Sequence, residues 1–104
     1  MKILHLTLKK KWFAMIDSGE KKEEYRAIKP YWINRLCNKI GYDMGENNCF
    51  KKYDAIKFRN GYAKNAPTIT LKWLGCGFGN AKPEWSDNYQ EKVFIIKLGE
   101  KINQ

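Results

Sequence analysis

The residues with the greatest capacity for chemistry lie in one short charged segment, from Gly19 to Arg26. The segment reads GEKKEEYR and holds six charged side chains and a tyrosine within eight residues. On an extended strand, alternate residues share a face, so Glu24 and Arg26 would lie side by side and could form a charge-assisted pair. An arginine held in this way is oriented to bind a phosphate group or a base edge. The segment is therefore a candidate anion-binding site.

Two alternatives remain open for this segment. The first is an exposed edge strand, whose charges protect it from pairing with another chain. The second is an enzyme site, because burial could lower the pKa of Lys21 enough for it to act as a base. A nearby carboxylate would oppose that shift and keep Lys21 charged, which suits an electrostatic clamp on an anion. If the protein is an enzyme, we expect Lys21 and Glu24 to be its catalytic residues.

Basic and aromatic side chains elsewhere extend the candidate surface. Three lysines, Lys9 to Lys11, begin the first expected helix, where cations are unfavourable for the helix dipole unless they bind an anion. The residues predicted to bind nucleic acid are Lys9, Lys21, Lys22, Tyr25, Arg26, Lys57 and Arg59. The rings available to stack on bases are Tyr25, Tyr31, Trp32, Tyr62, Trp85 and Tyr89, with Tyr25 and Trp32 as the first candidates.

Short strands and two helices must position these residues. Strands are predicted at residues 2–8, 22–28, 55–59, 68–74 and 92–98. Residues 22–28 are unusually charged for a strand, and residues 92–98 should form a central strand because they are apolar on both faces. Helices are predicted at residues 9–18 and 30–40, the first with Trp12, Met15 and Ile16 on one face and Gly19 beyond its end. This order has too few alternating units for a doubly wound sheet. The predicted fold class is α+β, a small curved β-barrel or sheet with two flanking helices.

Two further features favour a structural role over a chemical one. The run from Gly75 to Asn80 (GCGFGN) is superficially similar to a phosphate-binding loop, but it lies late in the chain and Pro83 follows it. We expect a bulge or sharp bend there. His5 is the only histidine, and a lone histidine is more often structural, although its face of the strand could border the cleft.

Composition limits the class of protein. The 104 residues fit a single domain, residues 1–104. The net charge of +9 favours partners such as RNA or DNA, although it also fits solubility alone. The three cysteines have no CxxC spacing, so we expect reduced thiols, no metal and a cytoplasmic protein. No apolar run is long enough to span a membrane, and no cofactor or oligomeric state is indicated.

The N-terminal part of the chain resembles the ASCH domain family, whose members are related to the PUA RNA-binding fold. The family pattern is a hydrophobic strand, a lysine, an aromatic residue in a short helix, and then G-x-K-T-x-E-x-R. The positions in register are Leu6, Leu8, Lys9, Trp12, Ile16, Gly19, Lys21, Glu24 and Arg26, and Lys22 stands where the family has threonine. The segment 52–58 (KYDAIKF) is similar to the family's G-D-x-V-x-F strand, with Tyr53 in place of the glycine.

The resemblance implies a closed or nearly closed barrel, a cleft beside the first helix and RNA binding. It also implies an alternative, because one bacterial group in the family is an amidohydrolase of acetylated cytidine, and ribonuclease activity has been proposed for others. In the amidohydrolase group a Lys, a Thr and a distant Glu carry the reaction. Lys21 matches that Lys, Glu24 stands at the Thr position, and Glu84 is the candidate for the distant Glu.

These observations predict a nucleic-acid-binding module with RNA or a nucleotide as its ligand. A hydrolase is the alternative, and a protein-interaction domain is the third hypothesis. We expect Lys21, Glu24 and Arg26 to border one polar pocket, with Lys9, Thr7 or His5 on its rim. Strict alternation separates Lys21 from Glu24 and Arg26, so a turn or bulge must begin near Lys22.

Overall fold

The sequence folds into one mixed sheet with two helices. The structure is a computed structural model and describes residues 1–38, 50–87 and 91–102. Its elements are β1 (Ile3–Leu8), α1 (Lys10–Asp17), β2 (Glu23–Ala27), α2 (Pro30–Leu36), β3 (Ala55–Asn60), β4 (Thr68–Asn80), the 3₁₀ helix η1 (Pro83–Trp85) and β5 (Lys92–Lys101). The five strands are ordered β1-β3-β4-β5-β2, with β1 and β3 parallel and the other neighbours antiparallel. The predicted α+β class and the central position of the last strand are confirmed.

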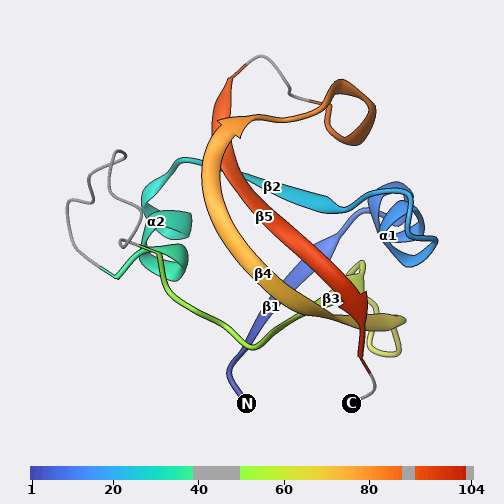
Figure 1. Ribbon diagram of the computed structural model, residues 1–104. Coiled ribbons are helices and arrows are strands. Elements are labelled where there is room, and N and C mark those ends of the chain that lie inside the picture. The colour runs from blue at the N-terminus through green and yellow to red at the C-terminus, as the bar shows by residue number, and fades with distance from the viewer. Residues whose placement is uncertain (39–49, 88–90, 103–104) are drawn as a thin grey trace.

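The sheet curves strongly but does not close into a barrel (Figure 1). β1 and β2 are the two edges of the strand order. Side chains span the gap between these edges: Arg26 Nη2 donates to the carbonyl of Thr7 at 3.2 Å. From α2, Arg35 Nη2 donates to the carbonyl of His5 at 3.3 Å. Guanidinium groups thus satisfy edge carbonyls that a closing strand would otherwise pair. The expected strong curvature of the sheet is present, and the sheet stays open between β1 and β2.

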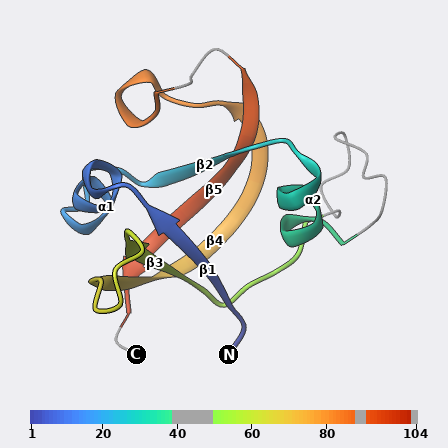
Figure 2. The same ribbon diagram turned by 180° about the vertical axis from the view of Figure 1, so that it is seen from behind.

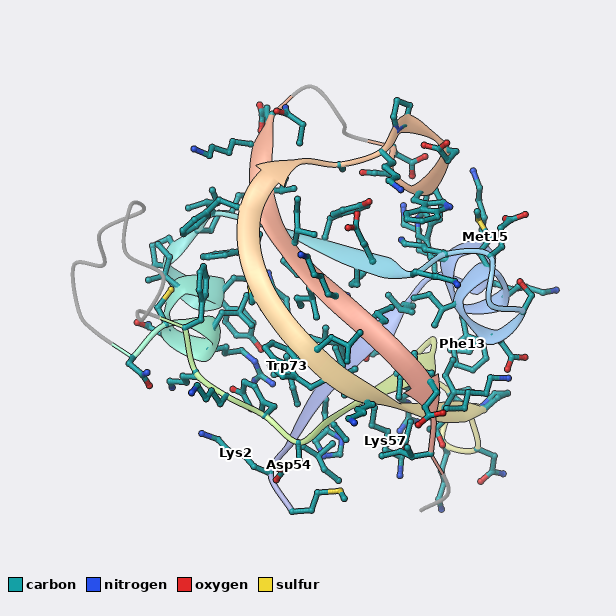
Figure 3. All side chains as sticks on the ribbon, in the orientation of Figure 1. Lys2, Phe13, Met15, Asp54, Lys57 and Trp73 are labelled. Atoms are coloured by element: carbon teal, nitrogen blue, oxygen red, sulfur yellow. The ribbon has the colours of Figure 1, made fainter. Side chains whose placement is uncertain are left out.

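The core lies inside the curve of the sheet. Leu4, Leu6 and Leu8 of β1 are all buried, which confirms the predicted alternation. Phe58 of β3 and Phe94 of β5 are completely buried and are the largest such side chains among the described residues. The start of β1 is fixed to the start of β3, because the backbone N–H of Lys2 donates to the Asp54 carboxylate at 2.6 Å (Figure 3).

The two helices lie at opposite sides of the sheet in both views of the ribbon (Figures 1 and 2). α1 starts and ends one residue inside its predicted bounds and buries Phe13 and Ile16, whereas Trp12 and Met15 are only half-buried. The predicted apolar face of this helix was therefore partly wrong. α2 stops at Leu36, because Cys37 is extended and forms a bridge with Phe50. The predicted end at residue 40 is wrong, and residues 39–41 lie outside the described residues.

β4 is longer than its apolar pattern indicated. The predicted strand ended at residue 74, but β4 continues to Asn80 and pairs with β5 along the glycine run. The register shifts between Leu71 and Trp73 and again between Trp73 and Gly75. Gly75 has φ +133°, a conformation that side-chain-bearing residues rarely adopt. The expected bulge is therefore present, and the glycine run belongs to a bent strand and not to a phosphate loop.

Candidate functional site

A turn after α1 places Lys21 beside the strand that follows it. Gly19 has φ +87°, and its N–H donates to the carbonyl of Ile16 at 3.1 Å. The N–H of Lys21 then donates back to the carbonyl of Met15 at 3.0 Å. β2 begins only at Glu23, so Lys21 precedes the strand and does not follow its alternation. The expected turn near Lys22 is present and resolves the conflict between alternation and a shared pocket.

Lys21, Glu24 and Arg26 form a buried charged cluster, called the triad below. Lys21 Nζ lies 3.0 Å from Glu24 Oε1, and Arg26 Nη2 lies 2.7 Å from Glu24 Oε2. The exposed fractions of the three side chains are 2%, 7% and 20% in chain order. β2 is an edge strand, but an exposed edge with solvated charges does not describe Lys21 and Glu24. That alternative is wrong for these two residues.

The triad carries more positive than negative charge. Burial lowers the pKa of Lys21, and the nearby guanidinium of Arg26 adds to that effect, while Glu24 opposes it. The exposed carboxylate of Asp87 also opposes it, more weakly. With Lys21 protonated, one carboxylate between a buried ammonium and a partly buried guanidinium leaves a net positive charge with little access to water. An anionic ligand would compensate this charge.

Aromatic rings surround Lys21 and Arg26. Lys21 Nζ lies 4.3 Å from the centre of the Trp12 ring and 5.5 Å from that of Tyr25. The Arg26 guanidinium lies 4.8 Å from the centre of the Trp32 ring. Cations over ring faces are attracted by the ring quadrupole, most strongly where water is excluded. The rings thus fix the two cations in place without neutralising them.

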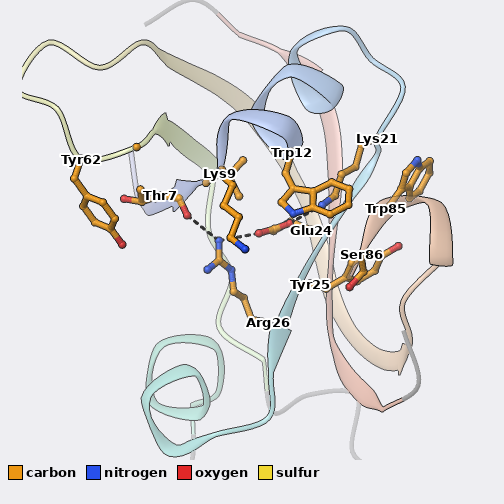
Figure 4. Close-up of a pocket in the computed structure, with 12 residues that line it drawn as sticks. Thr7, Lys9, Trp12, Lys21, Glu24, Tyr25, Arg26, Tyr62, Trp85 and Ser86 are labelled. Carbon is orange, nitrogen blue, oxygen red and sulfur yellow. Dashed lines mark hydrogen bonds and ion pairs between the residues drawn. The ribbon is translucent and has the colours of Figure 1, made fainter. Parts of the chain in front are cut away.

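The triad faces a cavity of about 550 Å³, called the central pocket below (Figure 4). Figure 4 shows Arg26 between Thr7 and Glu24, with Trp12, Trp85 and Tyr25 around Lys21. The volume is in the range of small-ligand sites. The lining residues are Thr7, Leu8, Lys9, Trp12, Lys21, Glu24, Tyr25, Arg26, Gly61, Tyr62, Trp85 and Ser86. The expectation that the triad borders one pocket with Thr7 and Lys9 at its rim is confirmed.

Tyr25 joins the pocket although alternation placed it opposite Glu24. Its hydroxyl donates to Glu23 Oε1 at 2.7 Å and accepts from the backbone N–H of Lys82 at 3.3 Å. Burial and the bond to Glu23 raise the pKa of Tyr25 well above its ordinary value. Tyr25 is therefore a neutral ring that ties β2 to the segment before η1.

Three predicted binding residues lie outside the central pocket. Lys22 is exposed and lines another cavity, next to Leu98 and Gly99. Lys57 and Arg59 line a third cavity with His5, over β1 and β3. Arg59 Nε donates to the carbonyl of Gly61 at 3.1 Å, so part of its hydrogen-bonding capacity serves the turn after β3. His5 is not among the residues that line the central pocket.

Sequence reasoning did not assign three of the pocket's aromatic walls. Trp12 was placed on the apolar face of its helix, but it covers Lys21. Tyr62 and Trp85 were counted as available rings without a position. The basic and aromatic composition indicated that rings and cations could share a site. The positions of η1 and of the turn at Gly61 had to be known before these rings could be assigned to the pocket. Glu84, the candidate third catalytic residue, is exposed and does not line the pocket.

The described residues show neither a metal cluster nor a membrane-spanning helix. No group of three His, Cys, Asp or Glu side chains within residues 1–38, 50–87 and 91–102 could hold a metal ion. Over the same ranges, no helix is both long and apolar enough to cross a bilayer.

Comparison with known proteins adds no family assignment. Neither family models, nor curated proteins, nor solved structures gave a match to the chain.

Proposed function

We propose that this protein is an ASCH-type, PUA-like module that binds single-stranded RNA by accepting one nucleotide in the central pocket. The observation that carries this proposal is the buried, net positive triad at an aromatic-walled cavity of about 550 Å³. A nucleotide offers the matching chemistry, a flat ring joined to an anion. Aromatic rings stack on any base, and Lys or Arg holds the phosphate.

The start of α1 supports an anionic ligand. Lys9 is the N-cap residue and lines the pocket, and its side chain makes no capping hydrogen bond. The first turn contains no acidic residue, so the positive end of the helix is not neutralised from within the helix. The cations at Lys9 and Lys10, which are unfavourable for the helix alone, are favourable when an anion lies nearby.

Titration with cytidine 5′-monophosphate and a short single-stranded RNA tests the proposal. We expect both to bind at low salt. The slope of log K against log salt for the RNA should be about −2 to −4, which at roughly −0.7 per phosphate corresponds to about three to six phosphate contacts, in the pocket and at the exposed lysines around it. Lys10→Ala, at an exposed position, should flatten the slope with little loss of affinity. Arg26→Ala should weaken binding by about 1–3 kcal/mol. Absence of binding by either ligand at low salt would overturn the proposal, and a deoxy oligomer of the same sequence tests the preference for RNA.

A second candidate function is hydrolysis of a modified nucleoside such as acetylated cytidine. The observation that favours it is the burial of Lys21, which lowers its pKa toward the range of a general base, although the neighbouring Glu24 opposes this shift. In such a reaction a water molecule adds to the acyl carbon, the carbon–nitrogen bond breaks, and the amine leaves with a proton as acetate is released.

Incubation with acetylated cytidine, with acetate release as the readout, separates the two candidates. For a binding module we expect the nucleoside to be recovered intact after it has bound. For a hydrolase, the wild type should release acetate, and Glu24→Gln should keep binding while acetate release disappears. The variant is compared at a temperature at which circular dichroism shows it to be folded. Acetate release by the wild type would contradict the binding-only proposal.

A further inference from the structure

A further cavity, distinct from those described above, adjoins the central pocket and shares a wall with it. This side cavity has a volume of about 480 Å³, and Thr7, Arg26 and Tyr62 line both spaces. Its remaining walls include Lys29, Tyr31 and Trp32, which lie at or next to the start of α2. Figure 4 shows Arg26 on the side of the central pocket that faces this helix. A ligand that leaves the central pocket past Arg26 therefore enters the side cavity.

The side cavity has the same chemistry as the central pocket, without a carboxylate. The Arg26 guanidinium lies over the Trp32 ring, and Tyr31 contacts that ring edge-on with centroids 4.8 Å apart. Tyr31 is 59% exposed and Tyr62 is 89% exposed, and the Arg35 guanidinium lies 5.5 Å from the centre of the Tyr31 ring. None of the described residues that line the cavity is acidic. Rings beside cations at an open surface favour stacking of bases along a single strand.

Arg26 has a hydrogen-bonding group left over at the junction of the two cavities. Its Nη2 contacts both Glu24 and Thr7. Its Nε is buried and has no partner among the described residues. A buried donor without an acceptor costs free energy. A phosphate oxygen that reached Nε would satisfy it.

We infer that the protein binds two consecutive nucleotides of single-stranded RNA. The first base lies in the central pocket, the linking phosphodiester at Arg26, and the neighbouring base in the side cavity against Trp32. This inference deepens the proposed function and depends on it.

The affinities of three ligands test the two-nucleotide site. The ligands are cytidine 5′-monophosphate, the same nucleotide with a second phosphate on its 3′ oxygen (pCp), and the dinucleotide pCpC. The dinucleotide should bind about tenfold more tightly than pCp, which carries the added phosphate but lacks the second base. If pCp and pCpC bind equally while the mononucleotide binds, the second base site is overturned and the proposed function stands. If no ligand binds, the proposed function itself fails.

Substitution of Trp32 tests whether its ring causes the tighter binding of pCpC than of pCp. Trp32→Leu keeps an apolar side chain and should bring the affinity for pCpC close to that for pCp, whereas Trp32→Phe should restore most of the difference. The readout is the ratio of the two affinities, because looser packing of Arg26 would weaken both ligands together. An unchanged ratio in Trp32→Leu would overturn the role of Trp32. The deoxy form of pCpC distinguishes RNA from DNA, and equal binding of the two forms would overturn the restriction to RNA.

Discussion

Replacement of Glu24 by glutamine should lower the free energy of unfolding by about 3 kcal/mol, the order expected when one partner of a buried ion pair is removed. Glu24 is the only carboxylate within the triad and contacts Lys21 and Arg26 through separate oxygens. The amide keeps the shape of the side chain but leaves two buried cations that repel each other. Urea unfolding followed by circular dichroism measures the loss.

Glu20→Gln is the matched control, since it removes the same charge from an exposed position one turn before the strand. Its effect should lie within about 0.5 kcal/mol. Cytidine 5′-monophosphate should stabilise Glu24→Gln more than the wild type, because the phosphate replaces the missing negative charge. If the two variants are equally stable, the ion pairs of Glu24 with Lys21 and Arg26 do not contribute to the stability of the fold.

Lys21→Met should weaken the binding of cytidine 5′-monophosphate about tenfold to one-hundredfold, with stability nearly unchanged. A hydrogen bond to a charged group is worth about 1.5–3 kcal/mol, and the variant removes it from the ligand. Methionine fills similar volume and removes the cost of burying an ammonium group, while Glu24 stays paired with Arg26. Lys22→Met, at the exposed neighbouring position, is the control and should bind almost as the wild type does.

The pH dependence of affinity gives an independent test of Lys21. The protonated amine binds the anion, and burial lowers its pKa from the ordinary value of 10.5. Wild-type affinity should therefore fall as the pH rises through a range below 10.5, before ordinary lysines lose their charge. The affinity of Lys21→Met should be nearly flat over that range. Equal alkaline loss in both proteins would show that another group titrates.

The charged segment and its partners could be predicted because they are close together in the chain. Gly19 at the end of a helix and the spacing of Lys21, Glu24 and Arg26 are local features, and local turn chemistry reproduces them. Trp85 and Tyr62 could not be assigned to the pocket in the same way. Their positions depend on the turn after β3 and on η1, which reach the pocket only when strands far apart in sequence pair.

The predicted ends of helices and strands were wrong where the sequence was apolar without alternation or where glycines interrupted the apolar pattern. The glycines from Gly75 to Gly79 suggested that the strand ends, but backbone pairing with β5 carries β4 through them. Cys37 fits the helical apolar face, yet its bridge with Phe50 requires an extended conformation. In both cases a contact made by the backbone with a remote segment overrides the local preference.

The order of the strands constrains when the pocket can form during synthesis of the chain. Among the five strands, β2 has a single neighbour, β5, and their register pairs Glu24 with Ile96. Until Ile96 has left the ribosome, β2 has no strand to fix it and the triad has no stable geometry. Contacts this distant in sequence are also slow to form, because a long loop must close first. Nascent chains that end before β5 should therefore show no nucleotide binding, and ligand capture during translation would report the moment at which the sheet is completed.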